Sequence, residues 1–236
     1  MLRTVEICVS DPASARAASE GKADRIELCA DLASGGITPS FGLMTQVIGE
    51  SPIPVHVLIR PRGGDFVVDR DEQIMMALDI DIARGLGAVG VVFGALRPDA
   101  TIDAGTTARL VDHARPLSVT FHKAIDLVPD PLAAIDTLAT LGVDRVLTSG
   151  GAGPARDNVA TLRAMAERSR GRLALMVGGG IRESDLPGLL IATGIDEVHL
   201  GSAVARAAPL PGPFGMRPAP VEAERVCRIV RLVKSS

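Results

Sequence analysis

The chain has 236 residues, a formal net charge of −3 at pH 7, 47% hydrophobic residues and 2% aromatic residues, with no Trp or Tyr. Its basic residues are scattered, so neither a phosphate-backbone footprint nor an aromatic stacking platform is expected, which argues against nucleic acid as a partner. No run approaches the roughly 20 apolar residues that span a bilayer, and the first eleven residues turn acidic before a signal-like core forms. These features predict a cytoplasmic protein without a membrane partner, folded as one domain over residues 1–236.

Strand and helix patterns alternate along the chain, beginning with an apolar strand over 4–10. Asp11 and Pro12 then predict the start of a helix that ends at Gly21, because aspartate caps free backbone N–H groups and proline fits the first helical turn. The next strands are expected within 24–29, 55–60, 89–96, 117–126, 144–151, 173–181 and 196–204, some of them with the loop that follows. The intervening helices are expected within 40–48, 71–87, 106–114, 130–142, 155–169 and 184–192.

Strands that alternate with helices require a parallel sheet. Eight strand–helix units in a chain of this length predict an α/β fold of the closed (β/α)8 type, a single-domain TIM barrel, over an open doubly wound sheet. Residues 207–220 are rich in proline and glycine, so no regular structure is expected there. This segment is interpreted as a connector, with a lid as the alternative, and residues 221–234 are expected to form an additional C-terminal amphipathic helix that packs on the barrel.

Period-two alternation turns many polar side chains toward the barrel axis, because the apolar residues of each strand must face the helices. Two interpretations stay open, since a buried carboxylate is costly unless it is paired. In the first, Glu6 and Glu27 form internal ion pairs, and their partners are Arg25 and Arg60. In the second, the residues at the strand ends form a functional site. The expected inward set is Glu6, Cys8, Glu27, Cys29, His56, Arg60, Thr120, His122 and His199.

Acid–base and cationic groups follow several strands, where barrel enzymes keep their sites. Glu27 and His122 are candidates for proton exchange next to a carbonyl group. Arg60, a third catalytic candidate, and Arg62 are suited to orient anionic groups through bidentate hydrogen bonds. Lys123 is expected to point away from the axis, which argues against a Schiff base.

Cys8 and Cys29 lie on neighbouring predicted strands with histidines nearby. Thiolate and imidazole groups suit copper(I) or zinc, so the two thiols are candidate metal ligands. The alternative is that each is a small core residue. With Cys227 the cysteine count is odd, which favours reduced thiols over disulfides.

Glycines follow the seventh and eighth predicted strands in MVGGGI (176–181) and HLGSAV (199–204). In barrels the loops after these strands often hold a phosphate group through backbone N–H groups, so Gly179, Gly180, Gly201 and Ser202 are candidate substrate-binding residues. Tight turns required by close helix packing are the alternative. These loops are expected to lie across the barrel from the two thiols.

Five segments resemble the CutC copper homeostasis family over about residues 5–204: RIELC (25–29), GGITPS (35–40), IRPRGGDF (59–66), TFHKAID (120–126) and LTSGG (147–151). The resemblance implies a TIM barrel, a cytoplasmic location, a homodimer and a role in handling copper(I). It also implies that Cys8 and Cys29 are the copper ligands. A copper-binding protein is therefore the first functional expectation. The alternative is an isomerase, epimerase or lyase that acts on a small phosphorylated or carboxylated sugar-like metabolite.

Overall fold

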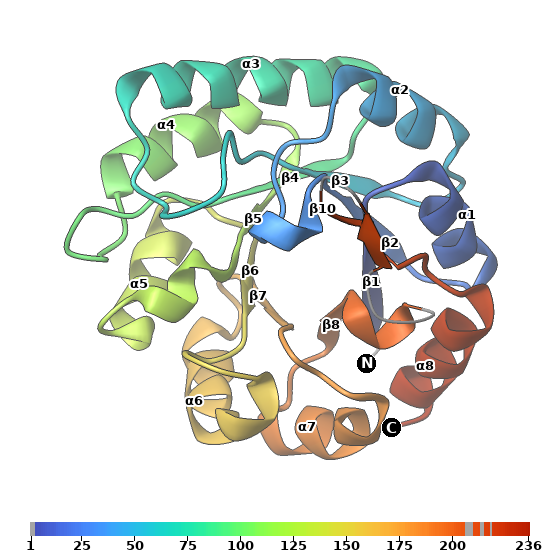
Figure 1. Cartoon of the computed structure of the whole chain (residues 1–236). Coiled ribbons are helices and arrows are strands. Elements are labelled where there is room, and N and C mark those ends of the chain that lie inside the picture. Colours follow the sequence, from blue (N-terminus) through green and yellow to red (C-terminus); the bar gives the residue numbers. More distant parts are fainter. Residues whose placement is uncertain (1–2, 206–209, 213–214, 218) are drawn as a thin grey trace.

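Eight parallel strands close into a ring at the centre of the computed structural model, which describes residues 3–205, 210–212, 215–217 and 219–236 (Figure 1). The strands follow one another around the barrel in chain order, and β1 closes the ring by pairing with β8. The strands are β1 (Thr4–Val9), β2 (Arg25–Leu28), β3 (Val55–Leu58), β4 (Gly90–Phe93), β5 (Ser118–Phe121), β6 (Arg145–Thr148), β7 (Ala174–Val177) and β8 (Glu197–Leu200). The predicted (β/α)8 TIM barrel is confirmed.

Helices surround the barrel on its outside, one after each strand along the chain (Figure 1). They are α1 (Pro12–Glu20), α2 (Phe41–Glu50), α3 (Arg70–Leu86), α4 (Ala104–Ala114), α5 (Pro131–Thr140), α6 (Val159–Ser169), α7 (Leu186–Thr193) and α8 (Ala223–Ser235). Among the described residues, no helix is both long and apolar enough to cross a membrane.

The predicted helix starts are present and are stabilised by side-chain caps. The Asp11 carboxylate accepts a hydrogen bond from the N–H of Ser14 (2.9 Å), and Pro12 opens α1. Asp130 caps α5 in the same way, and Ser40 caps α2 through the N–H of Leu43 (3.2 Å). Each cap satisfies a backbone donor that the helix itself leaves free, which typically stabilises the fold by about 1 kcal/mol.

The helix-facing side of the strands forms the main apolar core, as the alternation predicts. Ile7, Ile26, Val57 and Phe121 are fully buried between the barrel and the helices. Complete burial of such a side chain contributes about 1.5–3 kcal/mol. The opposite face of the same strands carries the polar residues, so the packing that fixes the strand register also fixes which side chains enter the barrel.

The additional helix α8 completes the outer ring between α1 and α7, as predicted. Its apolar face buries Val226, Ile229 and Val233. A Cβ atom at Gly21, just after α1, would lie 2.4 Å from the Cβ of Val226, so the absence of a side chain there allows α8 to approach. An ion pair of Lys234 with Asp24 (2.7 Å) ties the end of α8 to the start of β2.

Residues 207–220 contain regular structure, contrary to the sequence prediction. Two short strands, β9 (Leu210–Gly212) and β10 (Gly215–Arg217), pair antiparallel. In a two-stranded ribbon both strands are edge strands, and an edge position tolerates a proline without a backbone N–H group. Residues 207–209, 213–214 and 218 of this segment lie outside the described part of the chain.

Candidate functional site

A cavity of about 270 Å³ lies at the end of the barrel where the strands stop, lined by side chains and loops from β1, β2, β3, β5, β6, β7 and β8. This is the end at which TIM barrels carry their sites. The cavity brings together all the residues predicted to form the site except Arg62: Cys8, Glu27, Cys29, Arg60, His122, Gly179, Gly180, Gly201 and Ser202.

Two thiols face each other in the wall of the cavity. The Sγ atoms of Cys8 and Cys29 lie 3.5 Å apart, and both residues are buried. Cys8 is paired in register with Glu27, and Cys29 follows two residues later at the end of β2, so the two side chains share the inner face of neighbouring strands. The hydrogen bond to Cys29, burial and the nearby Glu27 carboxylate raise the pKa of the Cys8 thiol well above its usual value.

A half-buried imidazole adds a nitrogen donor beside the thiols. Potential ligand atoms of Cys8, Glu27 and His199 all lie within 4.8 Å of one another. The Nδ1 atom of His199 lies 2.7 Å from a carboxylate oxygen of Glu6, and its Nε2 atom lies 3.7 Å from Glu27. This leaves Nε2 on the side of Cys8 and Glu27, where it could bind a metal ion after losing its proton.

Electrostatics of the cluster follow from burial and neighbouring charge. Burial acts to lower the pKa of His199, but Glu27 and Glu6 outweigh it and raise that pKa. Burial raises the pKa of Glu27, and the charge of His199 only partly offsets this effect. The cluster therefore holds protons that a bound cation would displace.

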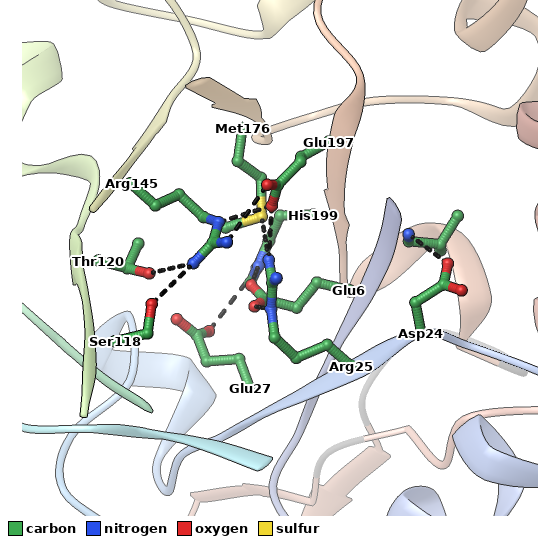
Figure 2. A network of polar contacts seen from close by, with 11 residues as sticks. Glu6, Asp24, Arg25, Glu27, Ser118, Thr120, Arg145, Met176, Glu197 and His199 are labelled. Atoms are coloured by element: carbon green, nitrogen blue, oxygen red, sulfur yellow. Dashed lines mark hydrogen bonds and ion pairs between the residues drawn. The ribbon is translucent and has the colours of Figure 1, made fainter. Parts of the chain in front are cut away.

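A network of ion pairs joins charged side chains of several barrel strands (Figure 2). Arg25 donates to Glu6 (2.5 Å) and to Glu197 (2.9 Å), and Arg145 donates to Glu197 (2.6 Å). Glu6 is completely buried, yet Arg25 and His199 outweigh its desolvation and keep its pKa low. The predicted internal pairing of Glu6 with Arg25 is confirmed, and the resulting carboxylate fixes the orientation of His199.

Arg60 does not form the predicted ion pair with Glu6 or Glu27 among the described contacts. β3 ends at Leu58, so Arg60 lies beyond the strand and its guanidinium group reaches the surrounding loops. It donates to three backbone carbonyls, those of Ser34 (3.1 Å), Gly36 (2.8 Å) and Gly64 (2.9 Å). Arg60 thus holds two loops together at the edge of the cavity, and within the described structure its buried Nε atom has no hydrogen-bond partner.

Arg62 lies outside the cavity. Its guanidinium group forms ion pairs with Asp65 (3.0 Å) and with Glu72 (2.5 Å) in the first turn of α3. The side chain is largely exposed and is saturated by these partners and by loop carbonyls. In this arrangement Arg62 stabilises the loop after β3 and does not reach the other predicted site residues.

His122 lies at the end of β5 and caps a short 3-10 helix, η2 (Lys123–Leu127). Its Nδ1 atom accepts a hydrogen bond from the N–H of Ala124 (3.3 Å), so the proton of the neutral ring is on Nε2. Burial and the charge of Arg60 lower the pKa of His122 to about 3. A ring that stays neutral at physiological pH is better suited to donate a hydrogen bond than to exchange protons.

Lys123 points into the cavity, contrary to the prediction from strand alternation. β5 ends at Phe121, so the alternation stops before Lys123, and the first turn of η2 redirects its side chain. The ammonium group contacts Asp126 (2.5 Å) and the hydroxyl group of Ser149 (2.6 Å).

The glycine loops border the same cavity. Gly179 (φ +99°) and Gly180 (φ +62°) adopt left-handed backbone conformations that favour glycine. Gly201 follows β8, next to β1, and a Cβ atom there would lie 3.8 Å from the Cβ of Cys8. The expectation that the eighth loop lies across the barrel from the thiols is therefore wrong, because ring closure makes the first and last strands neighbours.

The sequence model of the CutC family matches residues 3–204. The chain belongs to the CutC family. A copper homeostasis protein cutC homolog from Homo sapiens is 46% identical over 203 residues, which cover 86% of this chain and 74% of the relative. A family protein CutC from Rhizobium meliloti is 44% identical over 205 residues, or 87% of this chain and 83% of the relative. The chain therefore belongs to a family associated with copper homeostasis.

Solved structures agree with this assignment. A CutC protein from Streptococcus agalactiae superposes with a TM-score of 0.80 at 33% identity, covering 85% of this chain and 99% of the other. Phosphoribosylanthranilate isomerase from Pyrococcus furiosus superposes with a TM-score of 0.64 at 15% identity, covering 99% of this chain and 100% of the isomerase. The second likeness shows the shared barrel fold alone.

Two residues of this CutC-family site were not among the predicted ligands or substrate-binding residues. His199 was expected to face inward, and this parity was a usable signal for a metal donor beside Cys8 and Glu27. Lys123 gave no such signal, because its direction depends on a turn of η2 that strand periodicity does not describe.

Proposed function

We propose that this CutC-family protein binds copper(I) through the thiolates of Cys8 and Cys29 and acts in copper homeostasis. The observation that carries the proposal is the 3.5 Å separation of the two Sγ atoms in the wall of an open cavity. Copper(I) is a soft ion that prefers thiolate ligands, and two thiols this close can bind one ion after a small adjustment. Copper(I) is the cargo of the protein in this proposal and not a resident cofactor.

His199 supports the thiol pair as a further ligand. Its Nε2 atom lies beside Cys8 and Glu27, and Glu6 holds the opposite ring nitrogen at 2.7 Å. A carboxylate that accepts from the far nitrogen of a metal-binding histidine fixes the ring and increases its basicity. Glu27 is the least suited of the four donors, because a hard carboxylate oxygen contributes little to copper(I).

Copper binding must displace protons from this site. The raised pKa of Cys8 keeps its thiol protonated at neutral pH, and the raised pKa of His199 favours a protonated ring. Metal ligands bind as thiolate and neutral imidazole, so these groups lose protons when the ion binds. The affinity should therefore rise with pH, by up to tenfold per pH unit for each proton released.

We also propose that the protein works in the cytoplasm and as a homodimer. Two thiols that must remain reduced to bind copper(I) are compatible with a reducing compartment. The neighbouring helices α2 and α3 expose Phe41 (61% exposed), Ile74 (52%), Met75 and Leu78 (57%). Large apolar side chains gathered on adjacent helices support self-association through this face.

Competition with a chromogenic copper(I) chelator tests the copper proposal. The test compares the reduced wild-type protein with the double variant C8S/C29S and with C227S, a matched control on the outer helix α8. Wild type and C227S should take copper(I) from the chelator with equal affinity. The copper(I) affinity of C8S/C29S should be at least a hundredfold lower, which corresponds to about 2.7 kcal/mol of binding free energy. Equal affinity in all three proteins would overturn the proposal. Circular dichroism confirms that each variant is folded.

A further inference from the structure

We propose that the cavity has a second site, separate from the copper ligands, which binds the anionic group of a small phosphorylated or carboxylated sugar-like metabolite. The charged group would lie beside Lys123 and the loops after β7 and β8, and the carbon skeleton would extend toward His122. This inference does not depend on copper binding.

Lys123 supplies the positive charge of the proposed site. An ammonium group has three N–H donors, and the described contacts of Lys123 use two of them, to Asp126 and to Ser149. The Asp126 carboxylate also accepts from the hydroxyl group of Thr148 (2.5 Å) and from the N–H of Gly151 (3.2 Å). Its negative charge is therefore shared among several donors, and one donor of Lys123 stays available for a ligand.

Gly179 allows the ammonium group to occupy this position. A Cβ atom at residue 179 would lie 2.7 Å from the Nζ atom of Lys123, closer than any ordinary contact. The missing side chain thus brings the Lys123 charge directly over the loop that follows β7. This is the loop in which barrels commonly place a phosphate group.

Backbone donors border the same space. Within the described part of the chain, the backbone N–H groups of four residues that line the cavity donate to no acceptor: Gly179, Gly180, Gly201 and Ser202. Free N–H groups of consecutive loop residues beside a cation are the usual means by which proteins hold a phosphate or carboxylate group.

Two buried side-chain donors in the cavity wall also lack a partner among the described residues. His122 is 7% exposed and its Nε2 atom is unpaired; Arg60 is 8% exposed and its Nε atom is unpaired. An unpaired buried donor is costly, which indicates that a ligand completes the site. Both atoms are N–H donors, so they can bind a carbonyl, hydroxyl or carboxylate oxygen and cannot bind a metal ion.

The size and the apolar walls of the cavity limit the ligand. Phe66, Leu58 and Ile181 line the cavity together with the donors and would pack against a short carbon chain. At about 270 Å³ the cavity is slightly smaller than the usual range for ligand sites, roughly 300–1,000 Å³. A metabolite of a few carbon atoms with one anionic group fits this space, and a nucleotide does not.

Calorimetric titration of the reduced, copper-free protein tests the proposal with three probes: inorganic phosphate, glycerol 3-phosphate and glycerate. At least one probe should bind to wild type with a 1:1 stoichiometry. A phosphate site predicts binding of the first two, and a carboxylate site predicts binding of glycerate. No heat of binding for any of the three up to millimolar concentrations would overturn the proposal.

Variants distinguish the site from unspecific ion binding. K123M should lower the affinity for the probe by roughly tenfold or more, because a charge-assisted hydrogen bond is lost. The control K22M, at an exposed lysine, should leave the affinity unchanged. S202D changes an exposed residue, so the fold should be preserved. The added negative charge should repel the anionic probe and lower its affinity in this variant too. If neither K123M nor S202D weakens binding, the probe is an adventitious ion only and the proposal is wrong.

The two proposals can fail separately. C8S/C29S should bind the anionic probe as tightly as wild type, and K123M should bind copper(I) as tightly as wild type.

Discussion

Replacement of Arg25 by methionine should destabilise the fold strongly, because Arg25 is the shared partner of two carboxylates inside the barrel. Its Nε atom lies 2.5 Å from Glu6, which is 0% exposed, and its second nitrogen lies 2.9 Å from Glu197. Loss of one partner from a buried ion pair typically costs about 3–5 kcal/mol. Glu6 retains His199 at 2.7 Å and Glu197 retains Arg145, so we expect a loss of about 3 kcal/mol in the free energy of unfolding of R25M.

Urea unfolding followed by circular dichroism measures this loss in a chain that lacks Trp and Tyr. The double variant E6Q/R25M is the decisive comparison, because it removes the buried charge that R25M leaves without its arginine. It should be more stable than R25M by about 1 kcal/mol or more, although it lacks both charges of the pair. A loss of less than about 1 kcal/mol in R25M, or an E6Q/R25M variant no more stable than R25M, would show that Arg25 does not stabilise the buried Glu6 carboxylate.

Further predictions concern pH, packing and assembly. Burial lowers the pKa of His56 to about 4 from 6.5, so between these pH values the unfolded state binds more protons and stability falls as the pH falls. Between pH 6.5 and pH 4 the free energy of unfolding, measured with urea, should fall by ~3 kcal/mol more in wild type than in H56M. An equal fall in both proteins would contradict this prediction. G90A should destabilise the fold by ~1–3 kcal/mol in the same assay, because its Cβ atom would lie 2.5 Å from the His56 ring; an unchanged midpoint would contradict the packing argument. L78K should shift the protein toward monomer in light scattering, whereas an unchanged mass would place the interface elsewhere.

Local sequence rules predicted most of the fold because they act within single elements. Period-two alternation placed Glu6, Cys8, Cys29 and His199 inside the barrel, and the caps at Asp11 and Asp130 marked helix starts. Each of these features depends on a few neighbouring residues. The short strands β9 and β10 were missed because proline and glycine give no strand signal, while an isolated ribbon tolerates both.

The parts of the site that sequence could not predict depend on what happens after a strand ends. Lys123, Arg60 and Arg62 all lie beyond the last residue of their strands, where alternation no longer fixes direction. Loop and 3-10 geometry then sends Lys123 into the cavity and Arg62 out of it. Ring closure is equally non-local: it brings Gly201 next to Cys8, although the two residues are almost a whole chain apart.

In the proposed site, two thiols from neighbouring strands hold the copper ion. X-ray absorption at the copper edge of the one-copper complex of C227S identifies the ligands, because Cys8 and Cys29 are the cysteines that this variant retains. We expect two sulfur ligands on copper(I), with a nitrogen ligand from His199 that disappears in the variant H199F/C227S. A copper ion surrounded only by nitrogen and oxygen, or an identical spectrum from C8S/C29S, would show that the two thiols are not the copper ligands.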